Sequence, residues 1–432
     1  MNNIFRALQY RNFRLFFIGQ GVSLIGTWMQ AVAMGWLVYR MTNSPFLLGL
    51  VGFLSQIPAF LFGPFAGVIV DRFNRHRILI LTQILSMIQA VLLAALTLSG
   101  RIEVWHIILL GFLLGCINSL DIPARQTFVI EMVERKENLA NAIALNSFLF
   151  NSARLIGPSI AGVVIALLGE GICFLVNGLS FLAVIAALAS MKVGPLKIEG
   201  KKRDILADIK EGFGYAYNFL PIRYILMLLG VISVMGMSYA VLMPVFAKDI
   251  LGGGPGTFGI LMASGGVGAI AATIYLASRK SIVGLGDMIP VFATLFSIGI
   301  IVFSISRALW FSLIVLAATG FGMMAYMAAS NIIIQTVVDD DKRGRVMGFY
   351  MMTFIGLAPF GSLLAGSLAS RIGATNTLIA GGIICILASI AFAAKVPLLR
   401  KTIHPIYRKI GIIPEVAQGI GAASTLTVPP ED

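Results

Sequence analysis

A single arginine stands near the middle of a long apolar run. Arg154 lies in the run at 142–168, which is long enough to cross a membrane. A charge near the centre of a bilayer costs about 2.5–3.5 kcal/mol on insertion scales, so this guanidinium must face protein or water and needs a partner. The partner is Asp121, a set of backbone carbonyls or an anionic group on a substrate, and the sequence leaves these alternatives open.

No carboxylate lies in the middle of an apolar run. Asp71, Asp121, Glu131 and Asp287 all fall near the ends of such runs. Proton coupling usually requires an intramembrane group that can change its charge. We therefore take Asp121 as the coupling candidate, while the identity of the coupling ion stays open.

The first apolar run carries a polar stripe. Gln20, Ser23, Thr27 and Gln30 follow steps of three, four and three, which place them on one helical face. Such a face either lines a water-filled cavity or forms hydrogen bonds between helices. Trp28 in the same run offers a ring that can stack on an aromatic ligand. Polar residues of other runs extend the stripe: Asn118, Tyr239, Tyr326 and Asn331.

The residue types that enzymes use are scattered. The three histidines form no pair, and the three cysteines each lie inside an apolar run. No spacing predicts a disulfide framework or a metal site, and no Gly-x-x-x-x-Gly-Lys-Ser/Thr loop is present. We therefore expect no enzyme activity, no catalytic residue, no metal and no cofactor.

Composition narrows the class of protein. The 432 residues are 58% hydrophobic and only 12% charged, whereas soluble domains are about 25% charged. The chain predicts an all-α polytopic membrane protein with twelve transmembrane helices in two six-helix bundles. The expected spans are 13–39, 46–70, 78–98, 104–123, 142–168, 171–191, 222–246, 256–277, 288–306, 309–331, 346–370 and 375–395.

The positions of Lys and Arg predict the orientation. Of the 32 such residues, we place 26 in loops on one side, five on the other side, and Arg154 within a span. Because positively charged loops stay in the cytoplasm, we expect a multi-pass protein of the cell (inner or plasma) membrane with both termini cytoplasmic. The net charge of +13 does not indicate nucleic acid, because the basic residues sit between apolar runs.

The longest internal polar stretch divides the spans six and six. It predicts an N-terminal six-helix bundle at 1–191, a cytoplasmic linker at 192–221, a C-terminal six-helix bundle at 222–395 and a cytoplasmic tail at 396–432. The halves are weakly alike, since the pair Gln-Thr follows both the fourth and the tenth span. This likeness supports a parallel repeat around a central site.

The turn between the second and third spans carries the sharpest local pattern, Gly67-x-x-x-Asp71-Arg72-x-x-Arg75. It resembles the signature loop of the major facilitator superfamily, with Asn74 where that family has Gly; Asn tolerates a left-handed turn. The resemblance implies a twelve-helix transporter with two rocking bundles and a conformational latch at Gly67, Asp71, Arg72 and Arg75. An ordinary positively charged cytoplasmic turn is the alternative.

The fifth span contains Gly157-Pro158-x-x-Ala161-Gly162. This segment resembles the Gly-Pro-x-x-Gly-Gly signature of exporters and antiporters in the same superfamily, with Ala161 in place of one Gly. Gly157 and Gly162 allow close helix packing, and Pro158 removes a backbone donor and kinks the helix. The resemblance implies a helix kink that shapes or seals the cavity; a general packing kink is the alternative.

More of the chain resembles one branch of the superfamily, the enterobactin-exporter-like or transmembrane secretion effector group. The likeness covers roughly 5–395 and includes Asp121-x-Pro123-x-Arg125. In the superfamily the first, fourth, seventh and tenth spans line a central cavity. The resemblance therefore implies that the polar stripe of the first run faces this cavity, and the same holds for Asn118, Tyr239, Tyr326 and Asn331. Arg154 of the fifth run is a further candidate cavity or substrate residue, because its charge needs a partner.

These features favour a secondary active transporter that exports an amphipathic, siderophore- or drug-like small molecule by alternating access, with proton-coupled antiport as an open variant. The expected partners are the small-molecule substrate, membrane lipid and, in that variant, protons. We expect a monomer and no nucleic acid. A lipid or lysolipid translocator is the main alternative. A non-transporting membrane sensor or scaffold is less favoured, because the tail shows no domain pattern.

Overall fold

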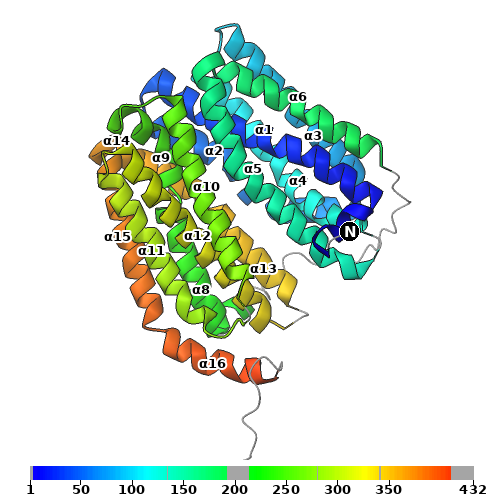
Figure 1. The fold of residues 1–432 in the computed structure, drawn as a ribbon, viewed down its shortest axis with the longest axis vertical. Helices are drawn as coiled ribbons and strands as arrows, with labels where there is room; N and C mark the ends of the chain where they lie inside the picture. The colour runs from blue at the N-terminus through cyan, green and yellow to red at the C-terminus, as the bar shows by residue number, and fades with distance from the viewer. Residues whose placement is uncertain (1–2, 134, 192–213, 280, 340–341, 410–432) are drawn as a thin grey trace, which may run out of the picture.

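A computed structural model of the chain describes residues 3–133, 135–191, 214–279, 281–339 and 342–409. These residues are almost entirely helical and include no strand. Twelve of the described helices are long and apolar enough to cross a membrane. The helices pack lengthwise against one another, as Figure 1 shows. The structure therefore has the predicted all-α, twelve-span architecture.

The spanning helices fall into two sets of six along the chain. The first set, with two short 3₁₀ segments, consists of η1 (Asn3–Gln9), α1 (Arg11–Thr42), α2 (Pro45–Arg72), α3 (Arg75–Leu98), α4 (Val104–Glu131), η2 (Lys136–Asn138), α5 (Leu139–Leu168) and α6 (Glu170–Ala189). The second set, with three π-helical segments, consists of α8 (Leu220–Val231), η3 (Ile232–Gly236), α9 (Tyr239–Val245), η4 (Phe246–Ile250), α10 (Pro255–Ala277), α11 (Leu285–Ile305), α12 (Leu309–Val337), α13 (Arg343–Met351), η5 (Met352–Gly356), α14 (Leu357–Ile372) and α15 (Ala374–Ala393).

Each predicted apolar run coincides with one of these spans, although the runs 171–191, 288–306 and 375–395 end one or two residues beyond their helices, and α4 is longer than the predicted 104–123. It continues through Pro123 to Glu131. A proline interrupts the backbone ladder, and here the Thr127 hydroxyl donates to the carbonyls of Pro123 and Ala124 at 2.9 and 3.0 Å. Apolar patterning misses such an extension because a helix that leaves the membrane no longer needs apolar side chains.

The seventh and eleventh spans are interrupted by π-helical segments that the sequence did not predict. The η3 and η4 segments interrupt the seventh span, and η5 interrupts the eleventh. The Ser233 hydroxyl in η3 donates to the Phe354 carbonyl in η5 at 2.6 Å, so two of these segments contact each other directly. Single π-turns of this kind are common at functional sites.

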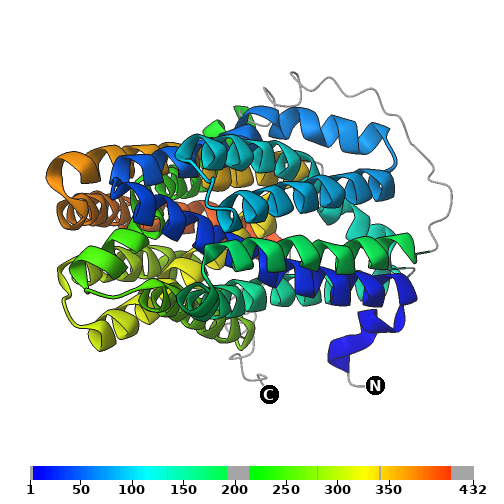
Figure 2. The ribbon, with the colours of Figure 1, turned by 90° about the horizontal axis from the view of Figure 1, so that it is seen from above.

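Helices of each set pack mainly within the set. In the N-terminal bundle, defined as α1–α6, α6 packs on α1 and α3, and α2 packs on α4. In the C-terminal bundle, defined as α8–α15, α12 packs on α10 and α11, and α15 packs on α11. Figure 2 shows the blue-to-cyan helices mainly on one side and the green-to-orange helices mainly on the other. The boundaries of the predicted domains stay a prediction, because 192–213 lie outside the described residues.

The two bundles make the same tight turn at equivalent places. Gly169 joins α5 to α6 and Gly373 joins α14 to α15, both with a φ of +84°. This backbone conformation suits glycine, because a Cβ would be strained there. The repeated turn agrees with the predicted repeat of the two halves.

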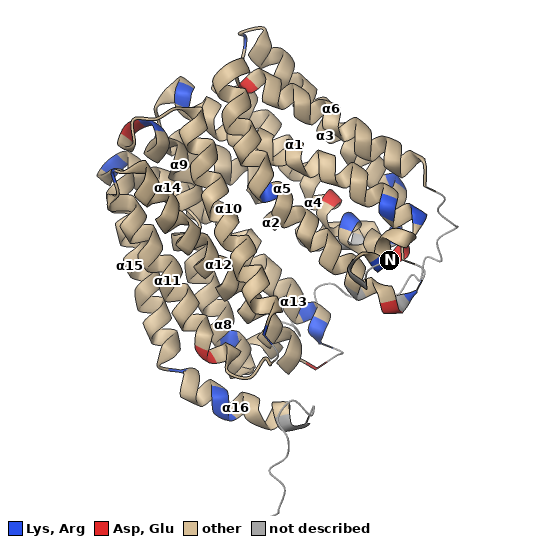
Figure 3. Cartoon of the chain, viewed as in Figure 1, with Lys and Arg blue, Asp and Glu red and all other residues tan. Residues whose placement is uncertain are grey.

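The outer surface of the helices is apolar. Among the large apolar side chains exposed on it, Trp310 is 80% exposed, Leu167 76% and Ile314 70%. Figure 3 shows Lys, Arg, Asp and Glu mostly toward the helix ends and few along their middles. A surface of this kind is stable in lipid, where exposed apolar side chains carry no hydration cost.

A further helix, α16 (Val396–Lys409), follows the last span. The sequence predicted a cytoplasmic tail at 396–432 without a domain pattern, and this helix was not among the predicted elements. It packs Leu399, Ile403 and Tyr407 against the C-terminal bundle, and Arg400 pairs with Asp287 of α11 at 2.6 Å. Burial raises the pKa of the Tyr407 hydroxyl, and the nearby Asp287 carboxylate adds to this rise. Its alternation of apolar and basic residues is typical of a helix that lies along a membrane surface.

Candidate functional site

A cavity of about 210 Å³ lies between the two bundles. Helices α1, α2 and α5 form one wall, and α9, α10, α12 and α14 form the other. Its lining residues are Trp28, Gln56, Arg154, Met237, Tyr239, Ala240, Val241, Met243, Leu261, Met262, Gly265, Gly266, Leu316, Ala358 and Ser362. The lining is mostly apolar, with one cation and no acid, which is typical of a site for an amphipathic small molecule.

Arg154 lies at the midpoint of α5 and faces this cavity. Its guanidinium carbon is 5.8 Å from the centre of the Trp28 ring, within the range of a cation–π contact. Trp28 also packs edge-on against Phe150, with ring centres 5.8 Å apart. The structure thus places a cation beside an aromatic surface on the N-terminal wall.

Glycines of the Gly-Pro segment bring α5 close to both neighbours. A Cβ on Gly157 would lie 2.5 Å from the Trp28 Cβ of α1. A Cβ on Gly162 would lie 3.1 Å from the Gly259 Cα of α10, in the other bundle. Helix α5 runs without a break through Pro158. The segment therefore forms a close contact between the bundles, beside the cavity.

Asp121 is not on the cavity wall. It is 4% exposed inside the N-terminal bundle. Its carboxylate accepts hydrogen bonds from Thr82 at 2.8 Å and Gln83 at 2.7 Å, and it pairs with Arg125 at 3.1 Å. Asp121 was one expected partner of Arg154. That alternative is wrong in this structure, because Arg125, one turn along α4, occupies the carboxylate instead.

The polar stripe of α1 faces α3 and α6. Gln30 donates to Gln89 at 3.0 Å and accepts from Asn177 at 2.8 Å. A Cβ on Gly26 would lie 2.6 Å from the Ser180 hydroxyl of α6. Helices α1 and α6 are therefore in close contact along this face.

The implied cavity role of the stripe is therefore wrong. Gln20, Ser23 and Gln30 are all at most 3% exposed, and Thr27 donates to the Ser23 carbonyl. Spacing defines a helical face, but it does not say which neighbour that face meets.

The further predicted cavity residues are divided. Tyr239 lines the cavity, but Asn118, Tyr326 and Asn331 do not. Tyr326 is completely buried in the C-terminal bundle, and its hydroxyl has no hydrogen-bond partner among the described residues. Asn331 accepts a hydrogen bond from Gln335 on the same helix. The implied cavity role is thus wrong for Tyr326, and for Asn118 and Asn331, which are outside the lining of this cavity, it stays a prediction.

Two polar lining residues were not predicted. Gln56 of α2 donates to the Gly52 carbonyl at 3.2 Å, and Ser362 of α14 donates to the Ala358 carbonyl at 3.1 Å. A lone amide in an otherwise apolar run is the signal that could have identified Gln56. Met237, Met243 and Met262 complete the apolar wall.

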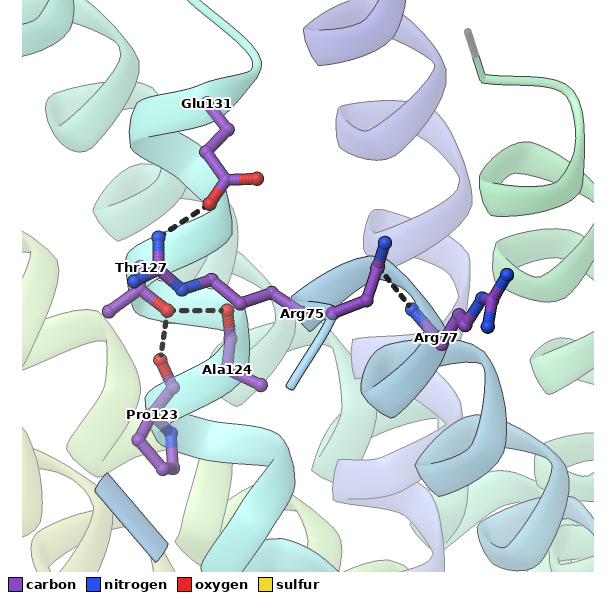
Figure 4. Close-up of polar contacts among 7 residues, drawn as sticks. Arg75, Arg77, Pro123, Ala124, Thr127 and Glu131 are labelled. Atoms are coloured by element: carbon purple, nitrogen blue, oxygen red, sulfur yellow. Dashed lines mark hydrogen bonds and ion pairs between the residues drawn. The ribbon is translucent and has the colours of Figure 1, made fainter. Parts of the chain in front are cut away.

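The signature turn between α2 and α3 is tied to its own bundle. Arg75 pairs with Glu131 of α4 at 2.5 Å, as Figure 4 shows. Asn74 has a φ of −65° and caps α3, because its side chain accepts from the Arg77 amide at 3.1 Å. The left-handed turn expected at Asn74 is therefore wrong, and an N-cap explains this residue.

The other predicted latch residues are less fully described. Arg72 is exposed at the end of α2. The surroundings of Gly67 and Asp71 lie outside the described residues. The latch therefore stays a prediction.

The contacts between the bundles are concentrated toward one end, here called the Tyr39 end and defined by Tyr39, Asn43, Lys248 and Asp249. The Tyr39 hydroxyl donates to Asp249, and Lys248 donates to Asn43 at 2.5 Å. Trp36 and Phe258 add a ring contact with centres 6.1 Å apart. Toward the opposite end, the bundles diverge between α5 and α13 in Figure 1.

The same end is sealed by backbone contacts. A Cβ on Gly49 of α2 would lie 2.5 Å from the Ser362 carbonyl and 2.8 Å from the Gly366 Cα of α14. A Cβ on Gly259 would lie 2.6 Å from the Pro158 carbonyl. Two helix pairs, α2 with α14 and α5 with α10, thus bring the bundles together at the Tyr39 end.

No metal-ligating cluster of His, Cys, Asp or Glu occurs among the described residues. The cavity is lined by apolar and aromatic side chains with a few polar groups, which suits the binding of a small molecule.

Comparison with known proteins identifies the family to which the chain is similar. A profile of the transmembrane secretion effector family matches residues 3–405. The staphyloferrin A transporter of Staphylococcus aureus (strain NCTC 8325 / PS 47) is 27% identical over 386 residues, covering 88% of this chain and 95% of that protein. The multidrug efflux pump Tap of Mycolicibacterium fortuitum is 25% identical over 82% of this chain and 88% of its own length.

A solved structure shares the fold. A bacterial homolog to the human lysosomal transporter Spinster, in an inward-facing and unoccupied conformation, has a TM-score of 0.68 at 13% identity. The match covers 91% of this chain and 98% of that chain.

Proposed function

Because the chain belongs to the transmembrane secretion effector family of major facilitator transporters, we propose that it exports an amphipathic small molecule from the cytoplasm by alternating access. The protein is a membrane transporter and not an enzyme. The observation that carries the proposal is the cavity between the bundles, which has one cation, an aromatic ring and a largely apolar wall. The names of the relatives, a staphyloferrin A transporter and a multidrug efflux pump, support this substrate class.

The proposal includes an orientation. The excess of Lys and Arg in the loops at the end opposite the Tyr39 end supports a cytoplasmic location for that end and for both termini. The Tyr39 end then faces outward, and the described state has its contacts on the outer side. A substrate enters this state from the cytoplasm, and export requires the contacts at the Tyr39 end to break.

Energy coupling through Asp121 is part of the proposal. Its carboxylate is buried and pairs with Arg125. Protonation would remove the negative charge from this pair and leave Arg125 without a counter-ion, which is a large local change in a medium of low dielectric. The latch at Gly67, Asp71, Arg72 and Arg75 would hold the cytoplasmic ends together in the opposite state, after Arg75 leaves Glu131.

Efflux from loaded cells tests the proposal. Cells that express the chain and cells that lack it are loaded with siderophores and macrolides, and the retained amount is followed over time. We expect faster loss of at least one compound from expressing cells. Equal retention of every compound would contradict export. Accelerated movement of labelled lysolipid across the bilayer, without such efflux, would favour the lipid translocator instead.

A further inference from the structure

We infer that Arg154 and Trp28 form a binding subsite for a carboxylate group of the transported molecule, so that the substrate is an anionic amphiphile. This inference rests on the proposed function only in taking the cavity between the bundles as the substrate site. It concerns the charge of the substrate and the residues of this chain that recognise it.

Arg154 has no counter-ion among the described residues. No residue that lines the cavity is acidic. The acidic side chains described in spanning helices have other partners: Asp121 pairs with Arg125, Glu131 with Arg75, Glu170 with Arg40, Asp249 with Tyr39, and Asp287 with Arg400. Among the described residues, the charge of Arg154 is therefore not neutralised within the protein.

The guanidinium of Arg154 stands where a membrane protein tolerates an unpaired charge least. Arg154 lies at the midpoint of a spanning helix, where an uncompensated cation is most costly. Trp28 covers one face of the guanidinium, but a ring contact leaves the N–H groups in the guanidinium plane without acceptors. No hydrogen bond from Arg154 to another described residue is found. A planar fork of donors beside an open cavity matches the geometry of a carboxylate, which accepts two parallel hydrogen bonds.

The cavity wall opposite Arg154 is mostly apolar. Across from Arg154, the cavity is lined by Met237, Met243, Met262 and Tyr239. Thioether side chains adapt to ligands of different shape. A molecule that places its carboxylate on Arg154 can therefore lay an apolar or aromatic body against this wall. A cationic amphiphile would instead meet a like charge with no acid to offset it.

A matched pair of probes tests the subsite on purified full-length protein. Dansylglycine carries a carboxylate, and dansylglycinamide carries the same fluorophore without the charge. Binding is measured by fluorescence for the wild type and for R154Q, R154K and R101Q. Arg101 is an exposed residue between α3 and α4, so R101Q is the matched control for loss of one positive charge.

We expect the wild type and R101Q to prefer the acid over the amide by about tenfold or more. R154Q should bind both probes about equally, with little change for the amide, and R154K should keep part of the preference. The melting temperature of each variant shows whether it is folded. Equal binding of both probes by the wild type, no binding of the acid, or an acid preference that survives in R154Q would each overturn the inference.

The binding test and the efflux test can fail separately. An acid preference that depends on Arg154, in a protein that exports nothing, would leave the subsite standing and contradict the proposed export. Export of neutral and anionic compounds alike, without an Arg154-dependent preference, would leave export standing and contradict the subsite.

Discussion

At the level of single residues, the two charged side chains Arg154 and Asp121 have different surroundings. Asp121 has a full set of partners in the N-terminal bundle, namely Thr82, Gln83 and Arg125. Among the described residues, Arg154 has the Trp28 ring beside it, no hydrogen-bond or ion-pair partner, and an open cavity in front. A charge with a complete set of partners suits a structural or switching role, and a charge without one suits ligand binding.

Asp121→Asn separates energy coupling from folding. The amide oxygen still accepts from Thr82 and Gln83, so the variant should insert and fold. If Asp121 carries the proton, the variant should lose substrate accumulation driven by a pH gradient while it keeps substrate exchange without a gradient. Both are measured with the purified protein in vesicles. Glu170→Gln serves as the control, since it also breaks the ion pair of a buried carboxylate in the N-terminal bundle. Gradient-driven accumulation in Asp121→Asn would remove the coupling role.

At the level of elements, the sequence predicts the spans well and the neighbours of each face poorly. A span through lipid requires about 20 consecutive apolar residues, so the twelve runs are visible in the distribution of apolar residues along the sequence. The extension of α4 to Glu131 and the π-helical segments are not visible, because they depend on polar partners and tertiary contacts. The alternating apolar and basic residues of α16 do indicate an amphipathic helix, but this segment is too polar to be a span.

The same limit explains the site. Arg154 is identifiable because a charge in an apolar run needs a reason. Gln30 is misplaced because its partners Gln89 and Asn177 come from two other helices. Gln56 was missed although its amide stands alone in an apolar run, because that signal does not say whether its side of α2 meets the cavity or another helix.

Gly259→Ala tests the contact between α5 and α10. A Cβ at this position would lie 2.6 Å from the Pro158 carbonyl and 2.7 Å from the Gly162 Cα, both in the other bundle, so the helices must separate. Overpacking of this kind costs about 1–3 kcal/mol, and the population closed at the Tyr39 end should fall by about tenfold or more.

Gly256→Ala is the matched control, because it lies one turn away on α10 and a Cβ there meets nothing within 4 Å. The measurement is the rate at which an impermeant thiol reagent labels a cysteine at position 36, which is buried between the bundles at the Tyr39 end. Equal labelling in the two glycine variants would show that the α5–α10 contact does not limit opening.

At the level of the whole molecule, the described state has one end joined by side-chain and backbone contacts while the bundles diverge toward the other. A transporter of this architecture must exchange one set of contacts for another in each cycle. The cavity in the middle can then reach either side only in turn.

Cross-linking Asn43→Cys to Lys248→Cys tests this requirement. The native side chains are hydrogen-bonded across the bundles, so a short, reducible thiol cross-linker should join the cysteines readily. We expect transport in vesicles to stop when the link forms and to return when it is reduced, while ligand binding from the open end persists. The two single-cysteine variants control for modification alone. Full transport by the linked protein would contradict alternating access through the Tyr39 end.

The close contact of α5 and α10 at their glycines has a consequence for how easily the bundles separate at the Tyr39 end. Gly162 and Gly259 meet backbone to backbone, and glycine has no rotamers to lose or regain. Parting and rejoining this contact therefore requires no side chain to find its place again. The contact can therefore separate and re-form in each transport cycle without a cost in side-chain entropy.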